Sequence, residues 1–192
     1  MLFATTAAIW ATNLAKTTNQ KSSLIHIYNM STALSSGAPS GALPKVENMR
    51  VAIVAAEWNG HITGALTQGA LDVFKAQGFD LDDDVEVFHV PGAVELTFAA
   101  SQLIETSNFD AIIVFGCVIR GGTPHFDYVC QSVTQGITML NADCDTPVIF
   151  GVLTVDTEQD ALDRAGGKLG NKGAEAAETA IKMFDFICKV RE

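Results

Sequence analysis

The chain has 192 residues, with 12 basic and 22 acidic side chains and a formal net charge of −10 at pH 7. This length suits one domain with a substantial core, with or without a tail, and the acid excess repels phosphodiester backbones, so we expect no nucleic-acid partner. No run of about eighteen apolar residues occurs, which argues against a transmembrane helix and against a membrane partner.

The amino-terminal part differs in composition from the rest. Short apolar clusters within residues 1–28 are interrupted by Thr and Asn, which fits either a weak presequence or a misassigned start with translation beginning at Met30. Residues 31–45 are rich in Ser, Gly, Ala and Pro, which is typical of a flexible lead-in. We expect residues 1–48 to be a disordered extension or a misassigned start, and residues 49–192 to be the folded domain.

The first predicted elements follow this segment. The apolar run 51–56 fits a strand that is buried on both faces. A helix with apolar residues at four-residue steps follows and stops at Gly78. A second strand is predicted over 85–90, and a second helix over 93–105.

The second half continues the alternation of strand and helix. The most hydrophobic run, 111–119, is expected to be a central strand, followed by a helix over 125–141. A strand over 147–155, a short helix over 157–165 and a long helix over 171–190 complete the pattern. This order predicts an α/β three-layer sandwich, flavodoxin-like, in which a four-stranded parallel sheet is flanked by helices. Ligands of such sheets gather beyond the carboxyl ends of the strands.

The loop from Arg120 to His125 joins the central strand to a helix. Its two glycines let backbone N–H groups approach a ligand closely. We expect Thr123 to be the N-cap with Pro124 as the first helical residue, and such a helix start attracts anions, phosphate above all. The positive end of the helix favours a neutral His125, which can act as a base. A tight turn with a surface histidine explains the same residues equally well.

The segment 163–173 holds three cations, Arg164, Lys168 and Lys172, and four glycines. Lys172 falls at the start of the last helix, where a cation is unfavourable, so a bound anion is its natural compensation. The spacing does not fit a P-loop. A solvated, flexible loop is the alternative interpretation.

Three further residues stand at the expected ligand end of the sheet. Trp58 offers a flat face for a heteroaromatic ring, or closes the core at its rim. Glu95 accepts hydrogen bonds from sugar hydroxyls, or merely places a favourable charge at a helix start. Cys117 lacks an adjacent histidine, so a nucleophilic role is not expected. None of the four cysteines forms a CxxC pair, and we expect reduced thiols in the cytoplasm.

Five segments in this order resemble the lumazine synthase family: 55–59, 90–96, 115–130, 146–154 and 163–173. The resemblance covers the chain from about Arg50 to Met183. It implies a transferase of riboflavin biosynthesis that condenses 5-amino-6-(D-ribitylamino)uracil with 3,4-dihydroxy-2-butanone 4-phosphate. The products would be 6,7-dimethyl-8-ribityllumazine and inorganic phosphate, and no metal or cofactor would be needed.

The resemblance also implies a role for individual residues. His125 would be catalytic and transfer protons, Trp58 would stack on the pyrimidine, and Gly122, Thr123 and Arg164 would bind the phosphate. The remaining substrate-binding positions would be Asn59, Ala93, Val94, Glu95, Cys117, Val118, Ile119, Phe150 and Lys172. Many relatives have Phe at the position of Trp58 and an aromatic residue at the position of Val94.

In the family, the positions of Phe150, Arg164 and Lys172 reach in from a neighbouring subunit. The resemblance therefore implies a homo-oligomer, a pentamer or a 60-mer in an icosahedral shell, with the site shared between copies. Two rival functions share this fold: a non-enzymatic assembly or flavin-binding protein, and a riboflavin synthase that dismutates lumazine. The presence of His125, Arg164 and Lys172 argues against the non-enzymatic protein, and the set of motifs is closer to lumazine synthase than to riboflavin synthase.

Overall fold

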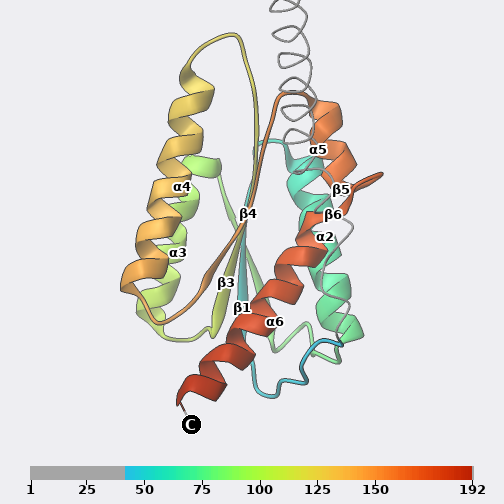
Figure 1. Ribbon diagram of the computed structural model, residues 1–192, viewed down its shortest axis with the longest axis vertical. Coiled ribbons are helices and arrows are strands. Elements are labelled where there is room, and N and C mark those ends of the chain that lie inside the picture. The colour runs from blue at the N-terminus through green and yellow to red at the C-terminus, as the bar shows by residue number, and fades with distance from the viewer. Residues whose placement is uncertain (1–41, 192) are drawn as a thin grey trace, which may run out of the picture. The chain divides into compact units, whose positions relative to one another are not determined.

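A computed structural model describes residues 42–191, and its packed unit begins at Leu43. Four parallel strands form a sheet in the order β2-β1-β3-β4, with helices on both faces (Figure 1). The predicted α/β sandwich is therefore confirmed, whereas the predictions for residues 1–41 lie outside the described residues. None of the helices within 42–191 is long and apolar enough to cross a bilayer.

The predicted strands and helices are present in the predicted order. The strands of the sheet are β1 (Val51–Ala56), β2 (Val85–Val90), β3 (Ala111–Ile119) and β4 (Val148–Val155). The helices are α2 (Gly60–Ala76), α3 (Leu96–Thr106), α4 (His125–Asp143), α5 (Glu158–Arg164) and α6 (Lys172–Arg191). A 3₁₀ turn, η2 (Ala93–Glu95), and a small antiparallel hairpin of β5 (Ala165–Gly167) and β6 (Gly170–Asn171) were not predicted.

The start of α4 differs by one residue from the prediction. Pro124, with φ −61° and ψ −6°, takes the N-cap position, and no side chain caps the helix. The N–H of Asp127 donates to the carbonyl of Pro124 over 3.0 Å, so the first turn closes on Pro124. Thr123 is therefore not the cap, because the nearly helical backbone of Pro124 moves the helix boundary one residue further along the chain.

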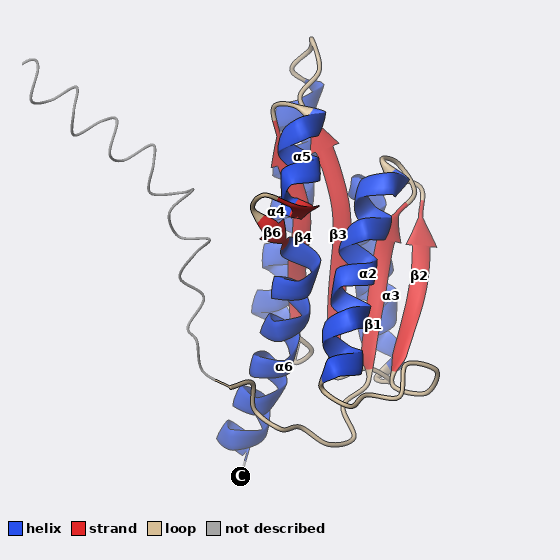
Figure 2. Ribbon diagram, turned by 90° about the vertical axis from the view of Figure 1, so that its right-hand side faces the viewer, coloured by secondary structure: helices blue, strands red, loops and turns tan. Residues whose placement is uncertain are grey.

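Two hydrophobic layers hold the sheet between its helices. Both β1 and the first seven residues of β3 are buried on both faces, which fits their continuous apolar sequences. Ile53 and Ile113 belong to the core cluster that includes residues of α2 and α6, whereas Val54 and Val114 belong to the cluster that includes residues of α3 and α4. Figure 2 shows α2 and α6 in front of the sheet and α3 and α4 behind it. Leu43 and Val46 also pack against the first of these layers.

A close approach between α2 and α6 fixes the start of α6. The side-chain amide of Asn171 donates to the carbonyl of Ala65 over 3.0 Å, and its oxygen accepts from the backbone N–H of Gly173 over 2.8 Å. A Cβ at Gly173 would collide with the backbone carbonyl of Leu66. Only glycine fits there, and the contact sets the position of the neighbouring Lys172.

We predict that Gly173→Ala lowers the free energy of unfolding by more than about 2 kcal/mol, since the added methyl group meets backbone that cannot rotate away. Gly64→Ala is the matched control, because a Cβ at this glycine of α2 meets nothing within 4 Å. The control should gain up to about 1 kcal/mol from helix propensity. Urea unfolding at one protein concentration, followed by circular dichroism, measures both, and equal midpoints for the two variants would contradict the close approach.

Candidate active site

A cavity of about 430 Å³ opens at the carboxyl ends of β1 and β3, beside the start of α4. Four segments form its walls: the turn after β1, the turn after β2, the end of β3, and the loop and first turn at the start of α4. The lining residues are Trp58, Asn59, Gly92, Ala93, Val94, Glu95, Cys117, Val118, Ile119, Gly121, Thr123, His125, Phe126 and Val129. The structure thus brings together ten of the predicted site residues, and Gly122 lies between two others of the lining.

The turn after β1 holds Trp58 at the mouth of this cavity. Asn59 has a left-handed backbone, φ 58° and ψ 40°, and its side-chain amide donates to the carbonyl of Cys117 over 2.9 Å. The N–H of Trp58 donates to the carbonyl of Pro91 over 3.1 Å. These two hydrogen bonds hold the backbone of the turn, and the Trp58 side chain stays 73 % exposed. An exposed, anchored aromatic face can stack on a ring, whereas a rim residue that closes the core would be buried.

The turn after β2 places Glu95 next to Trp58. A Cβ at Gly92 would lie 3.1 Å from a carboxylate oxygen of Glu95 and 3.5 Å from the Trp58 ring. The two side chains therefore flank Gly92. Glu95 occupies the N-cap position of α3 but makes no side-chain capping hydrogen bond. Its carboxylate is thus available to accept hydrogen bonds from a ligand in the cavity.

The loop before α4 presents backbone N–H groups without protein partners. Within the described chain, Gly121, Gly122 and Thr123 form no backbone hydrogen bond. A Cβ at Gly121 or Gly122 would meet nothing within 4 Å, so the packing of this chain does not demand glycine there. The loop ends at His125, the exposed first residue of α4. Exposed N–H groups at a helix start attract an anion.

Cys117 faces the cavity as a protonated thiol. Burial, together with the nearby charge of Glu158, raises the pKa of Cys117 to about 11. A thiol with this pKa carries almost no thiolate near neutral pH, so it contributes a small apolar surface and not a nucleophile.

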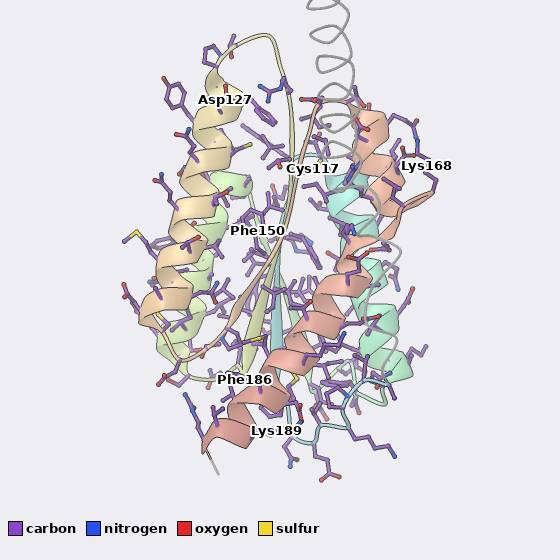
Figure 3. The ribbon with its side chains drawn as sticks, viewed as in Figure 1. Cys117, Asp127, Phe150, Lys168, Phe186 and Lys189 are labelled. Carbon is purple, nitrogen blue, oxygen red and sulfur yellow. The ribbon has the colours of Figure 1, made fainter. Side chains whose placement is uncertain are left out.

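A second cavity, of about 630 Å³, runs along β4 and α6. Among the described residues β4 is an outer strand of the sheet, paired only with β3. This second cavity contains the three remaining predicted residues, Phe150, Arg164 and Lys172. None of the three lines the first cavity. Figure 3 shows Phe150 partway along β4, away from Cys117 at the carboxyl end of the sheet.

The cations of the 163–173 segment are held in different ways. Arg164 donates from Nη1 to the carbonyl of Asp160 over 2.8 Å, and the ammonium of Lys172 lies 2.8 Å from both oxygens of Glu175. From the sequence we expected a bound anion to compensate the charge of Lys172. In the structure Glu175 of the same chain already does so. Lys168 turns to Asp163 instead, 2.7 Å away, and this hydrogen bond, with one from Gln159, lowers the pKa of that carboxyl.

Sequence reasoning missed two groups of residues. Phe126 and Val129 line the first cavity, and Val129 could have been found because it lies one helical turn after His125. Glu175, three residues after Lys172 on α6, carries the same kind of signal. Within residues 42–191, no group of three or more His, Cys, Asp or Glu side chains is arranged to hold a metal ion.

Comparison with known proteins gives one consistent result. Residues 48–187 match the family described as 6,7-dimethyl-8-ribityllumazine synthase. Relatives with that name come from Phocaeicola vulgatus, 54 % identical over 79 % of this chain and 89 % of the relative, and Bacteroides fragilis, 57 % identical over 72 % and 96 %. A third, from Parabacteroides distasonis, is 54 % identical over 76 % of this chain and 90 % of the relative.

We predict that Cys117 resists alkylation in the folded protein. At pH 8 only about one thiol in a thousand would be ionised for a pKa near 11, so iodoacetamide should modify the exposed Cys188 first. Because burial raises the pKa, the rate at Cys117 should climb as the pH approaches 11. Peptide mass spectrometry measures each site, with urea-unfolded protein as the control. Rapid modification of folded Cys117 at pH 7 would contradict the assignment.

Proposed function

The chain belongs to the 6,7-dimethyl-8-ribityllumazine synthase family, and we infer that it is the transferase that makes this lumazine in riboflavin biosynthesis. It condenses 5-amino-6-(D-ribitylamino)uracil with 3,4-dihydroxy-2-butanone 4-phosphate and releases inorganic phosphate. The observation that carries this conclusion is the family match over residues 48–187, which spans both halves of the candidate site.

We assign the first cavity to the pyrimidine substrate. The pyrimidine ring stacks on the indole of Trp58, and Val118 and Ile119 form the wall beside the ring. The ribityl chain extends toward Asn59, Ala93 and Glu95. The available Glu95 carboxylate supports this assignment, because sugar hydroxyls are hydrogen-bond donors. Val94 and Cys117 complete the pocket with apolar surface.

The phosphate of the second substrate binds at the loop before α4. Backbone N–H groups of Gly122 and Thr123, at the positive end of the helix, favour an anion. His125, which lines the same cavity, transfers protons during imine formation and the later deprotonation of the butanone carbon chain. Once phosphate leaves, the second amine closes the ring.

Phe150, Arg164 and Lys172 complete the site from a second copy of the chain. Their separate cavity along the outer strand β4 supports this proposal, because within one chain they line a different surface from His125. The fork of Arg164 clamps the phosphate and stabilises it as it leaves. The homo-oligomer is a pentamer or a 60-mer, so catalysis depends on assembly.

Positioning accounts for much of the expected rate. Holding the amine and the butanone face to face removes their translational freedom before reaction, which lowers the barrier by roughly 7 to 11 kcal/mol in favourable cases. Proton transfer by His125 adds a factor of about 10² to 10⁴. We propose that residues 49–192 form the enzyme domain, and the preceding Leu43 and Val46 pack against its core. The described cysteines are all unpaired, which supports a reducing compartment, the cytoplasm.

Purified full-length protein tests this function directly. Mixed with the two substrates, it should produce the absorbance of 6,7-dimethyl-8-ribityllumazine and one phosphate per lumazine, while light scattering on the same sample gives the oligomer size. An assembly or flavin-binding protein would scatter as an oligomer but form no lumazine. A riboflavin synthase would consume lumazine instead of forming it.

We predict that His125→Ala lowers kcat by about 10² to 10⁴-fold, because the proton-transfer group is lost, while the light scattering stays that of the wild type. His89→Ala is the matched control, since His89 is exposed on β2 and lines neither cavity. A His125 variant with the kcat of the wild type would remove the residue from the mechanism.

Arg164→Ala should raise the KM for the butanone phosphate by about 10 to 100-fold, the loss expected for charge-assisted hydrogen bonds to a phosphate. The KM for the pyrimidine should change little. Lys189→Ala removes a cation at the other end of α6 from Lys172 and serves as the control. If the Arg164 variant bound phosphate and substrate as the wild type does, the phosphate assignment would be wrong.

A further inference from the structure

Arg120 is the cation that begins the anion-binding loop, and neither the resemblance nor the cavity lining gives it a role. Its position, immediately before Gly121, is compatible with two different functions. It either binds the phosphate itself or holds the loop that binds the phosphate. The contacts of its side chain distinguish between the two.

The guanidinium of Arg120 joins three segments of the chain. Its Nε donates to Asp156 over 2.7 Å, and its Nη1 lies 3.3 Å from an oxygen of Asp127. Its central carbon lies 4.0 Å from the ring centroid of Phe126. The end of β3, the first turn of α4 and the connection between β4 and α5 therefore meet at one side chain.

The loop between these anchors has little else to fix its shape. In the described chain, residues 121–123 make no backbone hydrogen bond, and no side chain caps α4. The ion pair between Arg120 and Asp127 bridges the two ends of the loop, with Thr123 and His125 between them. Asp156 attaches this bridge to the segment that follows β4. The backbone N–H of Arg120 also donates to the carbonyl of Val155, the last residue of β4, over 2.9 Å.

The same contacts compensate the positive charge of Arg120. Two carboxylates already face the guanidinium, and its plane covers Phe126, which itself lines the first cavity. Nε and Nη1 are engaged with protein oxygens, and Arg120 is not among the residues that line the first cavity.

We propose that Arg120 is a positioning residue: bridged to Asp127 and Asp156, it holds the 121–125 loop and the start of α4 in the geometry that binds phosphate. This inference rests on the proposed function only for the identity of the anion. The bridge itself is a property of this chain.

The bridge should matter more for binding than for stability. The side chains of Arg120, Asp127 and Asp156 are 47 %, 56 % and 75 % exposed, and ion pairs exposed to this extent add little to global stability. Variants should therefore stay folded. A loop that shifts by about 1 Å, in contrast, can lose a large part of its binding and rate.

Two substitutions, Asp127→Asn and Asp156→Asn, separate positioning from direct binding, and a third, Arg120→Gln, tests whether this side chain contributes to phosphate binding at all. If Arg120 binds phosphate directly, removing either acid frees its charge, and the affinity for inorganic phosphate should stay equal or rise. If Arg120 positions the loop, all three variants should weaken the Kd for inorganic phosphate and raise the KM for the butanone phosphate, each by about tenfold. Arg120→Lys keeps the charge but not the fork, so it should restore only part of the loss.

Arg191→Gln is the matched control, because it removes the same type of side chain from an exposed ion pair with Asp145, at the carboxyl end of α6. It should leave both constants and the thermal midpoint unchanged. Isothermal titration with inorganic phosphate needs no turnover. Unchanged or tighter phosphate binding in both Asp variants, or no phosphate binding by the wild type, would overturn the inference. Failure of the wild type to form lumazine would instead refute the proposed function.

Discussion

The parallel sheet imposes the constraint on which the site depends. All four strands end at the same edge, so the segments after β1 and β2, the end of β3 and the start of α4 meet there and form the first cavity. The order β2-β1-β3-β4 then puts β4 on the outside, and Phe150, Arg164 and Lys172 line a cavity along it. One chain therefore separates an aromatic, histidine-bearing cavity from the cations that would clamp a leaving phosphate.

The cations themselves show how the fold balances binding against stability. Lys172 lies at the start of α6, where the helix dipole disfavours it, and Glu175 meets its charge from within the same turn. Arg120 is bound to two carboxylates and supports the loop before α4. Arg164 donates to a carbonyl, and within residues 42–191 its one salt bridge is with Asp160, 3.9 Å away. Among these three cations, Arg164 has the weakest pairing with acids and is the one best suited to a phosphate.

Sequence patterns were sufficient for the strands and helices: the helices show apolar residues at helical spacing, and β1 and β3 are short continuous apolar runs, which fits strands buried on both faces. The loops after the strands were also identified from sequence, since Trp58, Glu95 and His125 follow strands that must end at one edge. Three features could not be predicted from the sequence. The prediction of Thr123 as the N-cap of α4 is wrong because Pro124 adopts a nearly helical backbone, and the hairpin of β5 and β6 is too short for a periodic signal. Side-chain partners such as Asp156 for Arg120 lie far along the chain.

The central claim is that one working site takes its cavity from one copy of the chain and its cations from another. Co-expression of chains carrying His125→Ala with chains carrying Arg164→Ala tests it most directly. If sites are shared, random assembly places an intact His125 opposite an intact Arg164 in about a quarter of them. At a butanone phosphate concentration well below the KM of the Arg164→Ala variant, purified mixed oligomers should regain that share of wild-type turnover. Mixed oligomers no more active than the average of the two separate variants would contradict the account.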